Sequence, residues 1–151
     1  MERAIANLPD WTDRATKQML QHAVEKKRKF MKAKRIFFTA VYFTLFLAYG
    51  VLFHFYLTQI KPGEVSTAEI ISVLLGSQGY LIGLTLAISG VVGIRIFGEK
   101  KSKTEKEYHE IRCEIIDRSK DLWKNEWFLR RDEVFRLMKK EFDINLYDQS
   151  K

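Results

Sequence analysis

Two long apolar stretches, residues 36–60 and 70–97, constrain the fold of this chain more than any other feature. Each is longer than the roughly 20 residues that cross a bilayer core of about 30 Å as an α-helix. About a third of the 151 residues is thereby committed to lipid, so no large soluble core is expected. The sequence predicts an all-α fold built on a transmembrane helical hairpin with two spans.

Basic residues beside the two stretches predict their orientation. The segment 26–35 is rich in Lys and Arg and directly precedes the first stretch, and Lys100 follows the second. Lys and Arg near the ends of spans are retained in the cytoplasm. We therefore expect a multi-pass protein of the cell membrane with both termini cytoplasmic. The side chains expected to contact anionic head groups of the inner leaflet are Lys26, Lys27, Arg28, Lys29, Lys32, Lys34, Arg35 and Arg95.

These features divide the chain into five segments. They are a cytoplasmic N-terminal helical arm (1–35), a first transmembrane helix (36–60), an extracellular loop (61–69), a second transmembrane helix (70–97) and a cytoplasmic helical tail (98–151). In the loop, Pro62-Gly63 is a strong breaker, and Ser66 or Thr67 is placed to cap the second helix. Glu69 then lies in the first turn of that helix.

The N-terminal arm contains an amphipathic helical pattern. Trp11, Ala15 and Met19 follow one another at a spacing of four residues, which places them on one helix face. Two alternatives are open for this segment. Either the helix lies on the inner leaflet before the first span, or one continuous helix runs from residue 10 to residue 60.

The charged tail shows two helical patterns. The second is predicted over residues 131–142, where the apolar residues at helical spacing are Val134, Leu137, Met138 and Phe142. This pair of helices could pack on itself, on the arm, on a second subunit or on the membrane surface. Its aromatic side chains exceed what two short helices can bury. We therefore expect a cytoplasmic partner protein to bind at Trp123, Trp127, Phe135 and Met138.

The second apolar stretch carries its glycines in a single helical register. The small residues expected to line this face are Gly76, Gly79, Gly83, Ala87, Gly90 and Gly93. Small residues let two helix backbones approach closely, and van der Waals packing then holds the helices together in lipid. The sequence leaves open whether the partner is the first span or a second copy of the chain.

One polar pair is predicted inside the two stretches. If the ends of both spans lie at matching depths, His54 is level with Gln78. A histidine within a membrane is normally explained by a polar partner or by water, so we expect a hydrogen bond between these two side chains. The alternatives are a His54 side chain that reaches the outer interface, and a role in proton relay or ligand binding. Neither stretch contains Asp or Glu to share protons.

Four potential metal ligands, Glu105, His109, Cys113 and Asp117, follow one another at steps of four in the tail. Residues eight apart on a helix are separated by about 12 Å, so one ion reaches at most a neighbouring pair. Zinc sites usually need three or four protein ligands. We therefore expect a solvated helix face here, with no metal site and no cofactor.

Several well-known catalytic motifs are absent from the sequence, which has no Walker loop, HExxH, GxSxG or CxxC. Nothing in the sequence places Ser, His and acidic residues together as a nucleophilic site, so an enzyme is not expected. The basic segment 26–35 adjoins the predicted membrane, where lipid phosphates are the nearest anions. Nucleic acid is therefore not an expected partner.

Three features together point to a family: the two apolar stretches, the basic segment 26–35, and the tail sequences WFLRRDEVF (127–135) and KKEFDINL (139–146). Over nearly its whole length, the chain resembles a family of small two-span membrane proteins of unknown function from Bacillus and related Gram-positive bacteria. The resemblance implies a plasma-membrane location and supplies no catalytic residues.

Together these observations predict a membrane-anchored structural or interaction protein. It would associate through the glycine-lined face and the aromatic tail. The expected partners are a second copy of the chain or an unidentified cytoplasmic or membrane protein. The alternative, from another class, is a small transport or channel component that uses the polar residues His54 and Gln78 of the spans.

Overall fold

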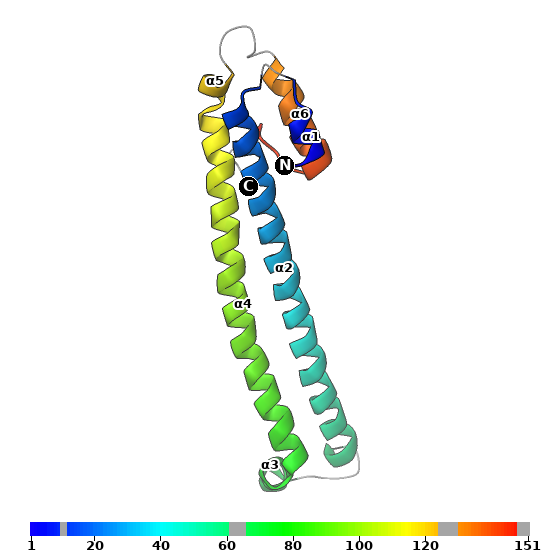
Figure 1. Ribbon diagram of the computed structural model, residues 1–151. Coiled ribbons are helices and arrows are strands. Elements are labelled where there is room, and N and C mark those ends of the chain that lie inside the picture. The colour runs from blue at the N-terminus through cyan, green and yellow to red at the C-terminus, as the bar shows by residue number, and fades with distance from the viewer. Residues whose placement is uncertain (10–11, 61–65, 124–129, 148–151) are drawn as a thin grey trace. The chain divides into compact units, whose positions relative to one another are not determined.

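The computed structural model describes residues 1–9, 12–60, 66–123 and 130–147. Within these ranges every regular element is helical and no strand occurs, so the predicted all-α fold is confirmed. In chain order (Figure 1), the elements are α1 (Arg3–Ala6), α2 (Arg14–Phe55), the π-helix η1 (Tyr56–Ile60), α3 (Thr67–Gly76), α4 (Gln78–Asp117), α5 (Ser119–Leu122) and α6 (Arg131–Phe142).

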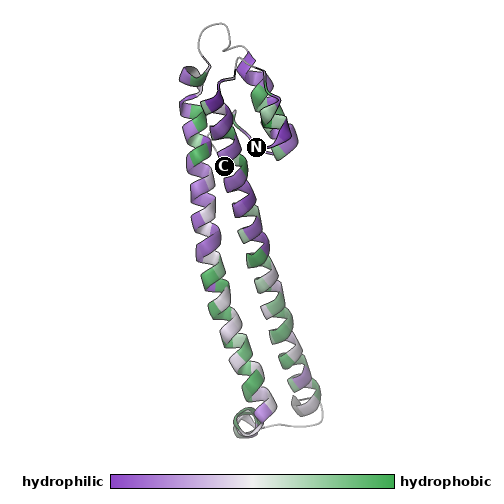
Figure 2. Cartoon of the chain, in the orientation of Figure 1, coloured by the Kyte–Doolittle hydropathy of each residue, from purple (hydrophilic) through white to green (hydrophobic). Residues whose placement is uncertain are grey.

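The chain forms two compact units. We call one the terminal unit, which combines Met1–Ala33 with Lys101–Lys151, and the other the apolar unit, which is Lys34–Lys100. The helices α2 and α4 contribute to both units, and Figure 2 shows that hydrophobic residues dominate their parts in the apolar unit. Two helical segments, Arg14–Thr58 and Gln78–Asp117, are long and apolar enough to cross a membrane.

The helix α2 continues without a break from the N-terminal arm into the first apolar stretch. Asp13 caps its start, because Asp13 Oδ1 accepts a hydrogen bond from the backbone N–H of Thr16 at 2.8 Å. No proline interrupts the helix. Of the two alternatives predicted for the arm, the structure has the continuous helix, which begins at Arg14 instead of residue 10.

The helix α3 begins where the sequence predicts a cap. Ser66 is its N-cap residue, and the Ser66 backbone N–H donates to Glu69 Oε2 at 3.0 Å. Glu69 thus lies in the first turn, where a carboxylate interacts favourably with the helix dipole. The rest of the predicted loop up to this cap, residues 61–65, lies outside the described residues.

The second apolar stretch is divided between two helices, which differs from the single helix predicted over 70–97. The helix α3 ends at Gly76, and Ser77 is extended (φ −95°, ψ 115°) before α4 begins. Glycine and serine are weaker helix formers than the aliphatic residues around them, and a Gly-Ser pair is a common place for a kink. The predicted second span is therefore carried in the structure by α4, which starts at Gln78.

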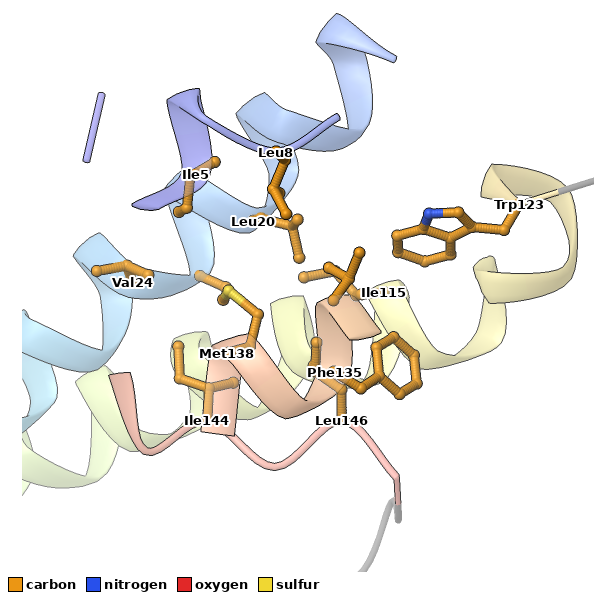
Figure 3. Close-up of a cluster of buried hydrophobic side chains, with 12 residues drawn as sticks. Ile5, Leu8, Leu20, Val24, Ile115, Trp123, Phe135, Met138, Ile144 and Leu146 are labelled. Atoms are coloured by element: carbon orange, nitrogen blue, oxygen red, sulfur yellow. The ribbon is translucent and has the colours of Figure 1, made fainter. Parts of the chain in front are cut away.

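A hydrophobic core to which both ends of the chain contribute holds the terminal unit together. Figure 3 shows its side chains converging from α1, α2, α4 and α6. Ile5 of α1, Leu20 of α2 and Met138 of α6 are fully buried in it. The tail thus packs both on itself and on the arm, two of the arrangements that the sequence left open. The other buried members are Leu8, Ala23, Val24, Ile115, Trp123, Val134, Phe135, Ile144 and Leu146.

The helix α6 occupies the predicted residues 131–142 and ends in a turn that returns the chain onto this core. Asp143 adopts the left-handed conformation (φ 54°, ψ 36°), which Asp tolerates better than most residues. The Asp143 N–H donates to the Lys139 carbonyl at 3.0 Å, as in an αL C-cap motif, and the Ile144 N–H donates to the Met138 carbonyl at 3.0 Å. This turn places Ile144 and Leu146 in the core.

Candidate functional site

Within the apolar unit, α2 and α4 run antiparallel and approach each other closely at two glycines. A Cβ atom added at Gly83 would lie 2.9 Å from Val51 Cγ2, and one added at Gly90 would lie 2.6 Å from Thr44 Oγ1. Both distances are shorter than ordinary carbon contacts of about 3.5–4.0 Å. Glycine at these two positions therefore permits the close approach of the helices.

The predicted glycine-lined face thus contacts α2 at Gly83 and Gly90, and its other positions are more open. A Cβ added at Gly76 would meet nothing within 4 Å. At Gly79 and Gly93 the nearest atoms belong to residues close by in the chain, each at 3.9 Å. Ala87 is half-buried. Only part of the predicted face is used for packing between the two helices.

A further glycine contact, at Gly98, was not predicted. A Cβ added there would lie 3.3 Å from Cε2 of Phe37, which is tighter than an ordinary contact. Gly98 follows Gly93 by five residues, whereas steps of three or four residues relate the small residues of the predicted face. The periodicity that identified the other glycines therefore did not include this one.

The polar partner of His54 is Tyr80, which corrects the predicted pairing with Gln78. His54 Nδ1 lies 3.1 Å from Tyr80 Oη. The prediction assumed that the ends of the two spans lie at matching depths. In the structure the close contacts at Gly83 and Gly90 set the register instead, and they bring a residue two positions further along α4 to His54.

Three side chains meet at this point, and we call them the His54–Thr58–Tyr80 cluster. Thr58 Oγ1 lies 2.9 Å from Tyr80 Oη and donates to the backbone carbonyl of His54 at 2.9 Å. The Tyr80 ring packs edge-on against Phe55, with ring centroids 5.3 Å apart. Thr58 belongs to η1, and π-helical turns are frequent at functional sites.

The cluster lines a groove of about 520 Å³, which we call the polar groove. The other lining residues are Gly50, Val51, Ser77 and Gly79. A Cβ added at Gly50 would meet nothing within 4 Å, and one at Gly79 would approach only Ser77. Because α2 and α4 each have a glycine at this point, space is left beside the three side chains of the cluster. The polar groove is the candidate binding site of the apolar unit.

Three of the basic residues predicted to contact lipid form ion pairs inside the terminal unit. The pairs are Lys26–Glu107, Lys27–Asp143 and Arg28–Glu2, each at 2.7 Å. Their acidic partners are distant in sequence, so the local charge pattern did not reveal them. Of the other predicted contacts, Lys29, Lys32, Arg35 and Arg95 are exposed and Lys34 is half-buried.

Two of these ion pairs lower the pKa of the carboxyl group that takes part in them. A hydrogen bond from Lys26 and its positive charge hold the pKa of Glu107 below its ordinary value of 4.5. In the same way, Lys27 holds the pKa of Asp143 below 3.8. Lys27 also donates to the backbone carbonyl of Asp143 at the end of α6.

We expect the terminal unit to lose stability in acid. Both carboxyl pKa values are lowered by folding, so the stabilisation is present above the ordinary values of 4.5 and 3.8. It is lost as the pH falls through the lowered values, because the unfolded chain then binds more protons. Near-UV circular dichroism during thermal unfolding, from neutral pH to about pH 3, measures this loss.

The variant Glu107→Gln should flatten part of this pH dependence, because the amide cannot be titrated. Glu110→Gln, at an exposed position of the same helix, serves as the control and should keep the wild-type profile. A wild-type acid profile in Glu107→Gln would contradict the assignment of this ion pair.

The tail residues predicted to bind a partner are buried, which corrects that prediction. Trp123 is 1% exposed, Phe135 2% and Met138 0%. Trp123 and Phe135 pack edge to face, with ring centroids 5.8 Å apart. Two short helices could not have covered these side chains, but the N-terminal arm supplies the missing surface. Trp127, the fourth predicted residue, lies outside the described residues.

The predicted row of potential metal ligands provides one close pair. His109 Nε2 lies 3.6 Å from Cys113 Sγ. Across the described residues, no group of three or more His, Cys, Asp and Glu side chains is placed to hold a metal ion. A pair supplies fewer protein ligands than a zinc site requires.

The chain matches one family model and a relative from Bacillus subtilis. Residues 19–149 match a family model described as "Protein of unknown function (DUF2663)". The uncharacterized protein YpbF of Bacillus subtilis (strain 168) is 33% identical over 157 residues, a match that covers 100% of both chains. No solved structure matches the chain. The predicted resemblance to an uncharacterised family present in Bacillus is confirmed by these matches.

Proposed function

Since the chain belongs to the DUF2663 family of proteins of unknown function, we propose a function from the geometry of its two units. The protein acts as a membrane-anchored structural or interaction protein. The helices α2 and α4 cross the cell membrane as a helical pair, and the terminal unit lies on the cytoplasmic side. The pair anchors the terminal unit next to the inner leaflet.

The exposure of the apolar helices is the observation that carries this proposal. In each of the two candidate spans, only 6% of the most apolar 18-residue segment is buried. Large side chains of α2 are more than 60% exposed, among them Tyr42, Phe43 and Phe46. Soluble monomers rarely expose contiguous apolar patches larger than a few hundred Å². The hydrocarbon core of a bilayer would cover such a surface.

The positions of the chain ends support a hairpin with both termini on one side. The contacts Thr44–Gly90 and Val51–Gly83, in which residue numbers rise on one helix as they fall on the other, support an antiparallel pair within the apolar unit. Both chain ends belong to the single terminal unit. The exposed basic residues Lys29, Lys32, Arg35 and Arg95 support the cytoplasmic side, where they would contact anionic lipid head groups.

Association with other proteins is part of the same proposal. Because the tail aromatics form the core of the terminal unit, a cytoplasmic partner would bind the outer surface of this folded unit. A second copy of the chain would pack on the part of the glycine-lined face that α2 does not contact and that lies outside the polar groove, at Gly76 and Gly93.

Cysteine labelling in intact cells tests the membrane topology. In a Cys113→Ser background, we expect a membrane-impermeant maleimide to label Ser66→Cys in intact cells. Ser102→Cys should be labelled only after the cells are permeabilised. Both serines are exposed and undergo the same substitution, so they form a matched pair. Labelling of Ser102→Cys in intact cells, or recovery of the protein in the soluble fraction, would contradict the proposal.

A small transport or channel component is the second candidate function, and the polar groove is the observation that favours it. Gln78, one of the residues on which this alternative was based, is not among those that line the groove. Further along the pair, Val51 and Thr44 fill the space at Gly83 and Gly90, which opposes a continuous hydrated path. Protection of a cysteine placed at the half-buried Ala87, which lies between these two glycines in the chain, would favour the anchoring function, and its labelling would favour transport.

A further inference from the structure

One assignment of hydrogens satisfies all three contacts of the His54–Thr58–Tyr80 cluster. Thr58 Oγ1 donates to the His54 carbonyl, because a carbonyl oxygen only accepts. With its hydrogen used, Thr58 Oγ1 accepts from the Tyr80 hydroxyl at 2.9 Å. Tyr80 Oη therefore accepts from His54 Nδ1–H at 3.1 Å. The neutral His54 ring accordingly carries its hydrogen on Nδ1 and leaves Nε2 as an acceptor.

This assignment makes the cluster an acceptor of hydrogen bonds. The single hydrogens of the Tyr80 hydroxyl, the Thr58 hydroxyl and the neutral His54 ring are all used within the cluster. Lone pairs are left on Nε2 of His54, on Oη of Tyr80 and on Oγ1 of Thr58. Among the residues that the structure describes, no Lys or Arg lines the groove. A ligand that matches these groups must supply donors, and the described lining residues present no fixed positive charge to it.

We propose that the polar groove binds the primary ammonium head group of a membrane lipid such as phosphatidylethanolamine. A primary ammonium supplies three N–H donors and no acceptor, which matches the three acceptor atoms of the cluster. The Tyr80 ring adds an aromatic face, which attracts cations. The open space at Gly50 and Gly79 provides room beside the cluster for the rest of the head group.

The position of the groove along the helices fits this ligand. His54 and Thr58 lie near the end of the first apolar stretch, and Tyr80 lies in the first turn of α4. The ends of spanning helices lie near the level of lipid head groups. The inference therefore rests on the proposed membrane-spanning function, which brings lipids to the groove.

Native mass spectrometry of the full chain, released from detergent micelles, tests the head-group selectivity. The probe is an equimolar mixture of phosphatidylethanolamine, its N-methyl and N,N-dimethyl derivatives and phosphatidylcholine, all with the same acyl chains. These head groups supply three, two, one and no N–H donors. We expect occupancy to fall stepwise along the series. Phosphatidylethanolamine should exceed phosphatidylcholine by about tenfold, which corresponds to ~1.4 kcal/mol and to about one net hydrogen bond.

Two matched pairs of variants locate this selectivity. Gly50→Leu should remove it, because the new side chain fills the groove without meeting an atom at its Cβ position. Gly76→Leu has equally open space but lies outside the groove, and it should keep the selectivity. Tyr80→Phe should remove it by deleting the central hydroxyl. Tyr49→Phe, an exposed position of α2 outside the groove, should not.

The tautomer of His54 tests the hydrogen-bond assignment directly. It depends on the bond from His54 Nδ1–H to Tyr80 Oη, and a Tyr80 that only fills space would not fix it. Imidazole ¹⁵N spectra should show the hydrogen of neutral His54 on Nδ1, and Tyr80→Phe should abolish this preference. His22→Asn and His109→Asn assign the signals, since the chain has three histidines. A hydrogen found on Nε2 in the wild-type protein would overturn the acceptor assignment.

Two outcomes of the lipid measurement would overturn the proposal. One is equal occupancy along the methylation series, and the other is selectivity that survives in Gly50→Leu. Higher occupancy by phosphatidylglycerol, added as a hydroxyl-bearing anionic probe, would likewise exclude an ammonium site. A flat lipid series together with the expected cysteine labelling would refute the groove alone. Reversed labelling would instead refute the membrane topology.

Discussion

Replacement of Met138 by alanine is expected to destabilise the terminal unit by about 2–5 kcal/mol. Met138 is fully buried at the centre of the core, where side chains from α1, α2 and α6 meet. Truncation removes the transfer free energy of the side chain and leaves a cavity that tightly packed neighbours can fill only in part. Urea unfolding of the full chain in detergent micelles, followed by near-UV circular dichroism, measures the change in free energy.

Met31→Ala is the matched control for this measurement. Met31 belongs to the same unit and is 48% exposed, so its truncation should change the free energy of unfolding by no more than about 0.5 kcal/mol. Equal effects of the two variants would contradict the core described for the terminal unit. They would also restore Met138 as a candidate for the surface that binds a partner.

Gly90→Ala is expected to destabilise the helix pair of the apolar unit by about 1–3 kcal/mol. The added Cβ would lie 2.6 Å from Thr44 Oγ1 and 3.2 Å from Thr44 Cβ. A different rotamer of Thr44 could move its hydroxyl but not its Cβ, so the helices must separate to accommodate the methyl group. Denaturation of the full chain with increasing SDS in mixed micelles, followed by far-UV circular dichroism, measures the loss.

The same substitution at Gly93 provides the control, and it should not destabilise the helix pair. The nearest atom to a Cβ at Gly93 is 3.9 Å away, which is an ordinary contact. Alanine should therefore be neutral there or stabilise the helix by up to about 1 kcal/mol through its higher helix propensity. Thr44→Ala should recover part of the loss in Gly90→Ala, because it removes the two closest atoms. Identical effects at Gly90 and Gly93 would mean that α2 and α4 do not pack as described.

Local patterns in the sequence predicted the elements that local interactions determine. The spacing of four apolar residues predicted α6 over the residues at which it occurs; they are Val134, Leu137, Met138 and Phe142. Ser66 and Glu69 predicted the start of α3. Helical periodicity and capping depend on residues a few positions apart, so they can be read directly from the chain.

The partners of individual side chains were predicted less well. The sequence suggested Gln78 for His54, and it did not reveal that Glu107 would pair with Lys26. These pairs join residues of different helices, and a shift of one or two positions in register exchanges one partner for another. The glycine pattern predicted close packing, yet it could not show which of its positions meet α2.

By itself, the sequence determined an all-helical chain with two long apolar segments flanked by charged ends. Only the tertiary structure decided that the two ends share one core, because Leu20 and Met138 become neighbours there across more than a hundred residues of chain. The tertiary structure also decided that Tyr80, not Gln78, completes the polar cluster with His54 and Thr58. The physical reason is the same in both cases. Apolar side chains can be covered by any surface of suitable shape, so hydrophobicity specifies that burial occurs, while packing between distant segments selects the partner.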